Sequence, residues 1–248
     1  MPNTRLAIVP AYNESESIAK VVENLHAHAP EFDVLVVDDG SLDDTAAQAE
    51  AAGARVLIHP INLGIGGAVQ SGYLFALSNN YEMAVQVDGD GQHPPQELSK
   101  LVSRLESEPA VDMVTGSRFM GEGDYPQTAA RRLGIVIFSL LLSLITRQKV
   151  TDPTSGFRLA NRRAIGLFAH DYPHDYPEVE AILMMHRHQL RCTEVPVRME
   201  LREGGRSSIT PLHSGYYMLK VLLAVFVGLF RSRSAAAKHA VSGAAGDL

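Results

Sequence analysis

"MAVQVDGDGQHPPQ", residues Met83 to Gln96, ends an apolar run in two aspartates that stand one residue apart. Alternate residues of an extended or tightly turned backbone face the same side, so Asp88 and Asp90 can direct their carboxylates to one point. Two negative charges held that close repel each other unless a cation lies between them. Oxygen ligands without a cysteine or histidine cage suit Mg²⁺ or Mn²⁺, which takes further ligands from water and phosphate oxygens. The stretch favours a metal site over the plainer interpretation, a solvated turn.

Strand-like and helix-like segments alternate on both sides of this stretch. Strands are expected at RLAIVPA, FDVLVVD, ARVLIHP and MAVQVDGD. Between the first two, Ile18, Val21, Val22 and Leu25 recur at helical spacing, with Asn13 as the expected N-cap and Glu16 three residues later. The alternation predicts an α/β protein with an open, mostly parallel sheet and helices on both faces.

The second half of the chain is less regular. We expect a strand at VDMVTGSR, a loop at Gly121 to Gln127, an apolar helix, a short strand and helix capped at Asn161, and a strand at RCTEVPVRMEL. The predicted division is one α/β domain over residues 1–210, an apolar or amphipathic helix over residues 211–232, and a disordered tail over residues 233–248.

The composition excludes several classes of protein. A single cysteine among 248 residues rules out an intramolecular disulfide framework, and no Cys/His cluster indicates structural zinc. Nucleic-acid binding is not expected, because the net charge is −6 and the basic region lacks interleaved aromatic residues. The N-terminus has no basic and long apolar leader, which favours a cytoplasmic protein.

Charge is distributed unevenly. Residues 1–100 hold four Lys/Arg against fourteen Asp/Glu, whereas residues 118–163 hold eight against three. This polarity suits one site for a cation and another for anions.

Three predicted strands end in unusual sequences: PAYNE, DDGS and DGDGQHPP. Ligands of open α/β sheets bind outside the carboxyl ends of the strands, so these ends should meet in one crevice. There Asp39 is expected to hydrogen-bond a ribose or base, and Tyr12 to cover a base. Gly64, Gly66 and Gly67 are expected to let the backbone approach a ligand. The dinucleotide fingerprint is incomplete, because Val69 occupies its third glycine position, and no P-loop is present.

Two apolar stretches raise the question of membrane contact: Leu133 to Ile145 and Tyr216 to Phe230. Each is shorter than the ~20 residues that span a bilayer. Both have basic neighbours, which fits helices that lie in a membrane interface or against a partner protein. A core helix and a dimer helix are the alternatives, so the oligomeric state stays open.

The motifs IVPAYNE, VVDDGS, VDGDGQHPP, GSR, TSGFR and REGGRSS occur in this order over residues 4–210. Together they resemble the inverting GT-A glycosyltransferases, most closely the polyprenyl-phosphate sugar synthases related to dolichol-phosphate mannose synthase. The resemblance implies a GT-A fold, a nucleotide-sugar donor, Mg²⁺ or Mn²⁺, and a polyprenyl phosphate such as undecaprenyl phosphate as acceptor. It further implies a peripheral location on the cytoplasmic face of the membrane, with a membrane surface or a small membrane protein as partner and a homo-oligomer as an open alternative.

The resemblance also assigns roles to residues. The nucleotide-sugar positions are matched by Pro10, Tyr12, Glu14, Val37, Asp39, Asp88, Gly89, Arg202 and Arg206. The metal positions are matched by Asp88, Asp90 and Gln92. Arg118 matches a residue that holds phosphates, and Arg131 or Arg132 matches an acceptor-phosphate arginine. The catalytic candidates of the whole sequence are Asp90, Arg118 and Asp152, the last as a carboxylate outside the quoted motifs.

The match departs from the family pattern at two places. The late loop has Ser207 and Ser208 where the family often has Ser-Lys, so a phosphate-binding charge is missing or comes from Arg206. Gly89 stands where alanine is common, which we expect to leave more room near the metal.

A phosphate monoester is largely a dianion at neutral pH, because its second pKa is near 6. Such an acceptor needs no general base. The alternative is transfer to a hydroxyl of a glycan or lipid, which requires a positioned carboxylate, with Asp152, Glu178 and Glu180 as candidates. A second alternative is a noncatalytic scaffold that binds nucleotide sugars.

Overall fold

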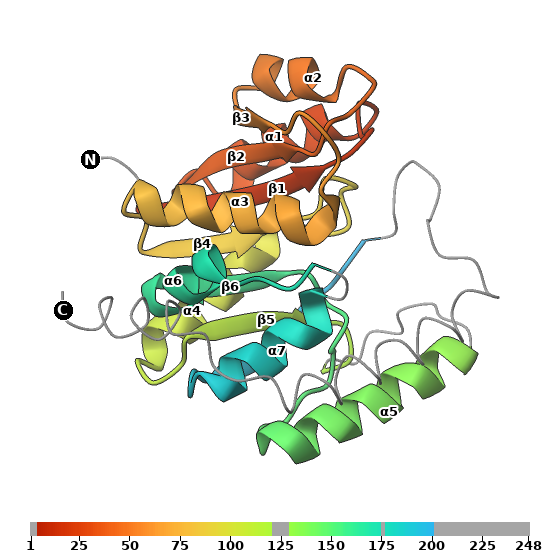
Figure 1. Cartoon of the computed structure of the whole chain (residues 1–248), viewed down its shortest axis with the longest axis vertical. Helices are drawn as coiled ribbons and strands as arrows, with labels where there is room; N and C mark the ends of the chain where they lie inside the picture. The colour runs from red at the N-terminus through yellow and green to blue at the C-terminus, as the bar shows by residue number, and fades with distance from the viewer. Residues whose placement is uncertain (1–3, 121–128, 175–176, 201–248) are drawn as a thin grey trace.

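The computed structural model describes residues 4–120, 129–174 and 177–200. Seven strands form one sheet in the order β3-β2-β1-β4-β6-β5-β7 (Figure 1). The pairings of β6 with β4 and β5 are antiparallel, and the others are parallel, which confirms the mostly parallel sheet. The strands are β1 (Arg5–Ala11), β2 (Phe32–Asp38), β3 (Arg55–Ile58), β4 (Met83–Gln86), β5 (Met113–Ser117), β6 (Arg158–Asn161) and β7 (Cys192–Pro196).

Helices cover both faces of this sheet, as predicted. One face carries α1 (Ile18–His28), α2 (Thr45–Ala51) and α4 (Leu98–Ser107), the last preceded by the 3₁₀ turn η1 (Pro95–Glu97). The other face carries α3 (Gly64–Ser78), α6 (Arg162–His170) and α7 (Pro177–Arg187), and α5 (Ala129–Thr146) packs on α7.

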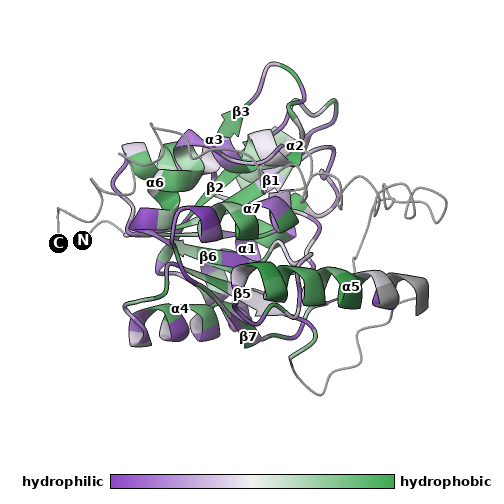
Figure 2. Cartoon of the chain, turned by 60° about the horizontal axis from the view of Figure 1, so that its bottom comes forward, coloured by the Kyte–Doolittle hydropathy of each residue, from purple (hydrophilic) through white to green (hydrophobic). Residues whose placement is uncertain are grey.

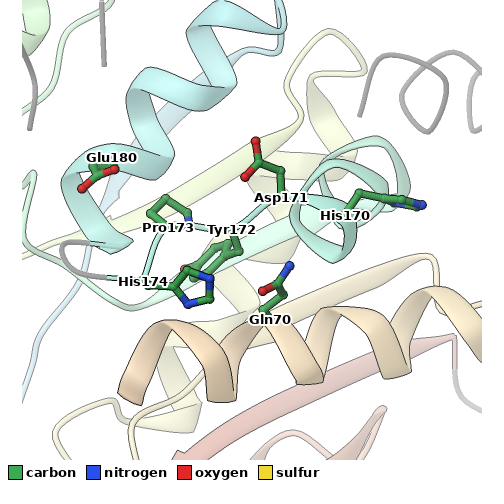
Figure 3. A pocket seen from close by; sticks show the side chains of 7 residues that line it. All are labelled: Gln70, His170, Asp171, Tyr172, Pro173, His174 and Glu180. Carbon is green, nitrogen blue, oxygen red and sulfur yellow. The ribbon is translucent and has the colours of Figure 1, made fainter. Parts of the chain in front are cut away.

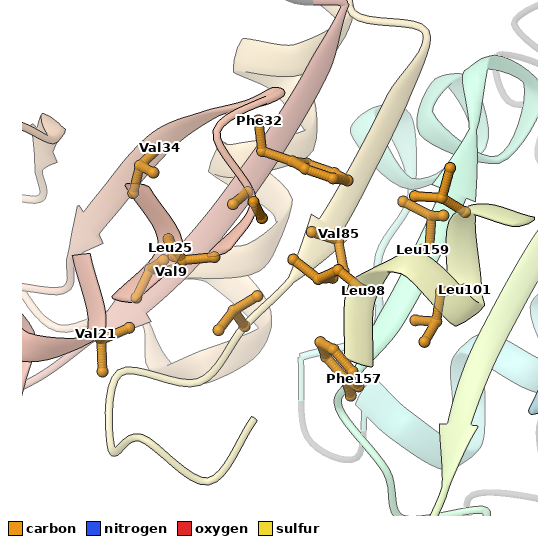
Figure 4. Packing of buried hydrophobic residues seen from close by; sticks show 14 of the residues in the cluster. Val9, Val21, Leu25, Phe32, Val34, Val85, Leu98, Leu101, Phe157 and Leu159 are labelled. Atoms are coloured by element: carbon orange, nitrogen blue, oxygen red, sulfur yellow. The ribbon is translucent and has the colours of Figure 1, made fainter. Parts of the chain in front are cut away.

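The core has two layers because alternate strand residues face opposite sides of the sheet. In β1, Val9 packs with α1 and α4, whereas Leu6 and Ile8 pack with α3 and α6. Figure 4 shows the first layer, in which Leu25, Phe32, Leu98 and neighbouring aliphatic side chains meet. The sheet is thereby buried on both faces, as its nearly continuous apolar strands require.

Helix α5 is apolar on two sides. On its buried side, Phe138 and Leu142 pack against Val179 and Leu183 of α7. Figure 2 shows the apolar character of α5 along much of its length. Among the helices within residues 4–120, 129–174 and 177–200, none is long and apolar enough to cross a membrane.

The first helix begins later than expected. Its N-cap is Ser17, and Asn13 instead adopts a left-handed backbone conformation with φ of 54°. The side chain of Asn13 accepts a hydrogen bond from Leu42 N at 2.8 Å, so it joins two loops. Asn161, in contrast, caps α6 as predicted by accepting from Ala164 N.

Several predictions concern residues outside the described ranges. These are the loop Gly121 to Gln127, the roles of Arg202, Arg206, Ser207 and Ser208, the helix over residues 211–232 and the tail over residues 233–248.

Candidate active site

The carboxyl ends of β1, β2 and β4 lie at one edge of the sheet. Pro10 is in register with Val37, and Asp39 N donates to Ala11 O at 2.9 Å, just beyond the paired region. On the other side of β1, Val87 N donates to Ile8 O at 2.9 Å. The three predicted loops therefore start side by side, as the sequence predicted.

Hydrogen bonds tie these loops to one another. Glu14 N donates to Thr45 Oγ1 at 2.9 Å, which joins the loop after β1 to the start of α2. Ser17 Oγ donates to Gly89 O at 2.8 Å, which joins the start of α1 to the Asp-Gly-Asp stretch. Tyr12 is 45% exposed beside them, so its ring is available to cover a flat ligand.

The two aspartates of the central motif lie at this edge, directly after β4. Asp88 Oδ1 accepts from Gln86 Nε2 at 3.0 Å, and its side chain is 34% exposed. Asp90 Oδ1 accepts from Gln92 N at 3.1 Å, which closes a tight turn, and both residues are partly exposed. The carboxylates are thus anchored by the protein while they keep access to solvent.

The carboxylates of Asp88 and Asp90 fit a divalent cation that takes its remaining ligands from a substrate and from water. The described part of the chain contains no cluster of three or more His, Cys, Asp or Glu side chains arranged as a metal cage. Two partly exposed carboxylates are what Mg²⁺ or Mn²⁺ uses when phosphate oxygens and waters complete its shell.

His93 lies beside the motif without facing the crevice. The residue is 4% exposed, and its ring stacks on Phe157 with centroids 4.9 Å apart. Nδ1 accepts from Asp88 N at 3.0 Å, which fixes the tautomer, so Nε2 carries the proton 3.6 Å from Asp88 Oδ2. His93 therefore holds the backbone of Asp88 in place.

The expectation that Gly89 leaves room near the metal is wrong. A Cβ at this position would meet Pro10 O at 3.2 Å, Ala11 Cβ and Ile18 Cδ1, which belong to the protein interior. Glycine here allows close packing of the motif on β1 and α1.

Asp39 is buried at 3% exposure and engages the protein itself. Oδ1 accepts from Leu63 N at 2.8 Å and from His59 Nδ1 at 2.7 Å, and Oδ2 accepts from Gly64 N at 2.8 Å. His59 Nε2 in turn lies 2.9 Å from Ser71 Oγ. The carboxylate holds the first turn of α3 against the end of β2, and a contact with ribose or base stays a prediction.

The glycines that begin α3 serve packing, and the expectation that they admit a ligand is wrong for two of them. A Cβ on Gly66 would lie 2.3 Å from Pro173 O, and one on Gly67 would lie 2.6 Å from Leu63 Cβ. Gly64 differs, because its φ is +82° and nothing lies within 4 Å of the position of a Cβ.

Arg118 follows β5 at the same edge of the sheet, since β5 and β4 run in the same direction. Its Nε donates to Asp152 Oδ2 and its Nη2 to Asp152 Oδ1, both at 2.7 Å. Nη2 also donates to Thr154 Oγ1 at 2.8 Å. Arg118 is 9% and Asp152 0% exposed, so this two-point ion pair is buried and fixes the plane of the guanidinium.

The loop that carries Asp152 also touches the aspartate motif. A Cβ on Gly156 would lie 2.8 Å from Gln86 Nε2 and 3.4 Å from Asp88 Oδ1. Arg118, Asp152 and Asp88 therefore belong to one connected edge, although they are far apart in the sequence.

The other predicted site residues lie on α5, on α7 and at the ends of β1 and β2. Arg131 and Arg132 lie in the first turn of α5, where Arg132 is exposed. Glu178 is in the first turn of α7, and its burial raises the pKa of the carboxyl, which Arg158 partly offsets. Pro10 and Val37 are buried at the ends of their strands.

A polar pocket of about 290 Å³ lies between α3, α6 and the start of α7 (Figure 3). No local pattern in the sequence marks this pocket, because its walls come from separate elements. It is lined by Gln70, His170, Asp171, Tyr172, Pro173, His174 and Glu180.

Three further residues at this edge, which no sequence motif predicted, hold the site residues in place: Gln86, Thr154 and Glu194. Gln86 holds Asp88, Thr154 holds Arg118, and Glu194 holds the backbone of Thr151 and Asp152. Thr154 and Glu194 act on residues distant in the chain, and Gln86 acts on its near neighbour Asp88 through an amide that no motif marks.

Comparisons with known proteins found relatives of this chain. Residues 6–167 match the family model described as Glycosyl transferase family 2. The chain is 33% identical over 216 residues to an undecaprenyl-phosphate mannosyltransferase of Micrococcus luteus, covering 83% of this chain and 87% of that protein. It is 29% identical over 229 residues to a polyprenol monophosphomannose synthase of Mycolicibacterium smegmatis, covering 87% and 84%.

A solved structure supports the fold. Glucosyl-3-phosphoglycerate synthase from Mycobacterium tuberculosis, in complex with Mn²⁺, UDP and phosphoglyceric acid, superimposes with a TM-score of 0.71. It is 22% identical in sequence, and the alignment covers 94% of this chain and 80% of that one.

Proposed function

The chain belongs to glycosyl transferase family 2, and we propose that it moves a sugar from a nucleotide diphosphate sugar to the phosphate of a polyprenyl phosphate, with inversion. It is a glycosyltransferase. Relatives named as undecaprenyl-phosphate and polyprenol-phosphate mannosyltransferases favour this acceptor class.

The contact between Arg118 and Asp152 supports the proposal most directly. Both carboxylate oxygens of Asp152 accept hydrogen bonds from the Arg118 guanidinium, and Asp152 is fully buried. A carboxylate engaged in this way is poorly suited to take a proton from a hydroxyl. An oriented guanidinium at the same edge suits a phosphate, which is already ionised and needs no base.

On the donor side, Asp88 and Asp90 would hold the cation, with Gln92 closing their turn. A divalent cation at this position supplies charge that stabilises the departing diphosphate. Tyr12, Glu14 and Asp39 lie at the ends of β1 and β2, where the nucleoside would bind. Arg202 and Arg206 remain proposed diphosphate contacts from the resemblance alone.

On the acceptor side, α5 presents an apolar face that no described element covers. Val136, Ile137, Leu140 and Leu144 are 44–78% exposed and lie on one face of the helix. Arg132, Arg147 and Lys149 are exposed at its two ends. We assign this face to the surface of a membrane, on its cytoplasmic side, where basic residues meet anionic headgroups and the prenyl chain resides.

The decisive experiment measures release of nucleoside diphosphate from a panel of UDP-, GDP- and dTDP-sugars, with Mg²⁺ or Mn²⁺ and with or without undecaprenyl phosphate in detergent. Release that requires both metal and lipid phosphate would support the proposal and identify the sugar. Release with a glycan or a lipid alcohol in place of the lipid phosphate would contradict the proposal that the acceptor is a polyprenyl phosphate. Donor binding without release with any acceptor would favour a scaffold.

A further inference from the structure

Glu194 in β7 accepts hydrogen bonds from three donors of the loop that precedes β6. Thr151 N donates to Oε2 at 2.7 Å, Thr151 Oγ1 donates to Oε2 at 2.6 Å, and Asp152 N donates to Oε1 at 3.0 Å. Glu194 is in register with Thr115 of β5, three residues before Arg118. One carboxylate thus fixes the backbone on both sides of the peptide bond that leads into Asp152.

A second contact links the same loop to β5. Ser117 Oγ lies 2.7 Å from Thr151 Oγ1, and Thr151 Oγ1 already donates its proton to Glu194. Ser117 must therefore donate to Thr151, since each hydroxyl has one proton. Ser117 immediately precedes Arg118, so Glu194, Thr151 and Asp152 hold the arginine from two directions.

We infer that Glu194 is a positioning residue for the acceptor phosphate, acting through Thr151 and Asp152 to fix the guanidinium of Arg118. The inference rests on the proposed function, in which Arg118 binds that phosphate. A purely structural role for Glu194 predicts a different outcome, because it would weaken stability, donor binding and acceptor binding together.

The test uses Glu194→Gln in the full-length protein. The amide of glutamine has one oxygen that accepts hydrogen bonds and one NH₂ group that only donates them. One set of N–H and O–H donors of the loop would therefore face an NH₂ group, so the loop must shift. We expect the Kd for farnesyl phosphate, and the KM for undecaprenyl phosphate, to rise about tenfold or more, as for the loss of a hydrogen bond to a charged group. The Kd for the nucleoside diphosphate of the donor with Mn²⁺ should change less than about twofold.

Two further variants make the test specific. Glu108→Gln removes an exposed carboxylate that pairs with Arg104 at 2.9 Å and should leave both affinities unchanged. Thr151→Val removes the hydroxyl while keeping the shape of the side chain, and it should reproduce the acceptor-selective loss. If Glu194→Gln does not fold, Thr151→Val decides the question by itself.

A double-variant comparison tests the route of action. In an Asp152→Asn background, Glu194→Gln should add less than about a twofold change in acceptor affinity, because the effects of residues that act in series do not add. Independent multiplication of the two effects, or equal loss of donor and acceptor binding, would overturn the inference. If the wild-type protein binds nucleotide but no polyprenyl phosphate, the proposed function and this inference are both overturned. If Glu194→Gln and Thr151→Val bind the acceptor as the wild type does, only the inference is overturned.

Discussion

Asp152 accepts two parallel hydrogen bonds of 2.7 Å from the guanidinium of Arg118, and the pair is buried at the edge of the sheet where Asp88 lies. A buried ion pair of this kind is costly to leave half complete, because removing one partner strands the other charge away from water. The pair therefore constrains both the chemistry and the effect of substitutions at this edge.

Asp152→Asn separates a positioning role from a general base. If Asp152 orients Arg118, the KM for the acceptor should rise about tenfold or more, while kcat at saturating acceptor falls less. If Asp152 removes a proton, kcat should fall by several orders of magnitude with little change in acceptor affinity. Initial-rate kinetics across acceptor concentrations distinguish the two, and Asp44→Asn at an exposed position is the control.

Asp90→Ala should abolish transfer, with a loss of about a thousandfold or more, because stabilisation of the departing diphosphate depends on a metal held there. Release of nucleoside diphosphate across a Mn²⁺ titration measures the effect, and Mn²⁺ binding followed by electron paramagnetic resonance measures the site itself. Gln96→Ala, at an exposed position of the following turn, is the control. Wild-type turnover by the alanine variant would remove Asp90 from the metal site.

Leu140→Asp combined with Leu144→Asp should abolish binding to anionic vesicles. Each side chain is more than 60% exposed on α5, so the changes should leave the fold intact while placing charge on the face assigned to the membrane. Flotation with vesicles of anionic lipid, at low and high salt, measures the effect. Leu74→Asp on α3, which is 46% exposed, should float like the wild type. Undiminished flotation of the α5 variant would move the contact elsewhere.

Gly66→Ala should destabilise the protein by about 1–3 kcal/mol, as overpacking does in close-packed interiors. An alanine inside a helix ordinarily gains about 0.5–1 kcal/mol over glycine, so the sign of the change reports the contact with Pro173 O. Urea unfolding provides the measurement, and Leu74→Ala on the same helix is the comparison. A stabilised Gly66→Ala variant would show that the segment at Pro173 moves aside freely.

Glu178→Gln should stabilise the protein at neutral pH and lose that advantage in acid. Burial raises the pKa of the Glu178 carboxyl above its ordinary value of 4.5, so the folded state disfavours the charged form. The wild-type protein is therefore favoured when the pH lies below the pKa that the carboxyl has in the unfolded chain. This advantage disappears as the pH rises through the higher pKa of the folded protein. Thermal unfolding at pH 7 and near pH 4 checks this, with Glu82→Gln at an exposed site as control. An equal shift at both pH values would contradict the prediction.

Local patterns in the sequence were sufficient for much of the architecture. Apolar runs that end in acidic loops predicted β1, β2 and β4, and helical spacing of Ile18, Val21, Val22 and Leu25 predicted α1. These signals are local because strand and helix periodicities depend on near neighbours. They also placed Asp88 and Asp90 at the carboxyl edge, since parallel strands share that edge.

The start of α1 shows the limit of such patterns. Asn13 and Ser17 are both good capping residues, and the contacts of Asn13 with the loop after β2 decided that Ser17 takes the cap. The same limit applies to Gly66 and Gly89, whose neighbours come from distant parts of the chain.

What only the tertiary structure decided is which side chains are already engaged. Asp39, Asp152 and Glu194 are carboxylates of similar chemistry, and nothing local distinguishes one that is free to bind a ligand from one that holds the protein together. Their partners are His59 and the start of α3, Arg118, and the Thr151 backbone. The sequence by itself determined the mostly parallel type of sheet and the position of the aspartate motif. Folding determined which charged side chains remain available to a substrate, because a long-range ion pair or hydrogen bond exists only once the chain has folded.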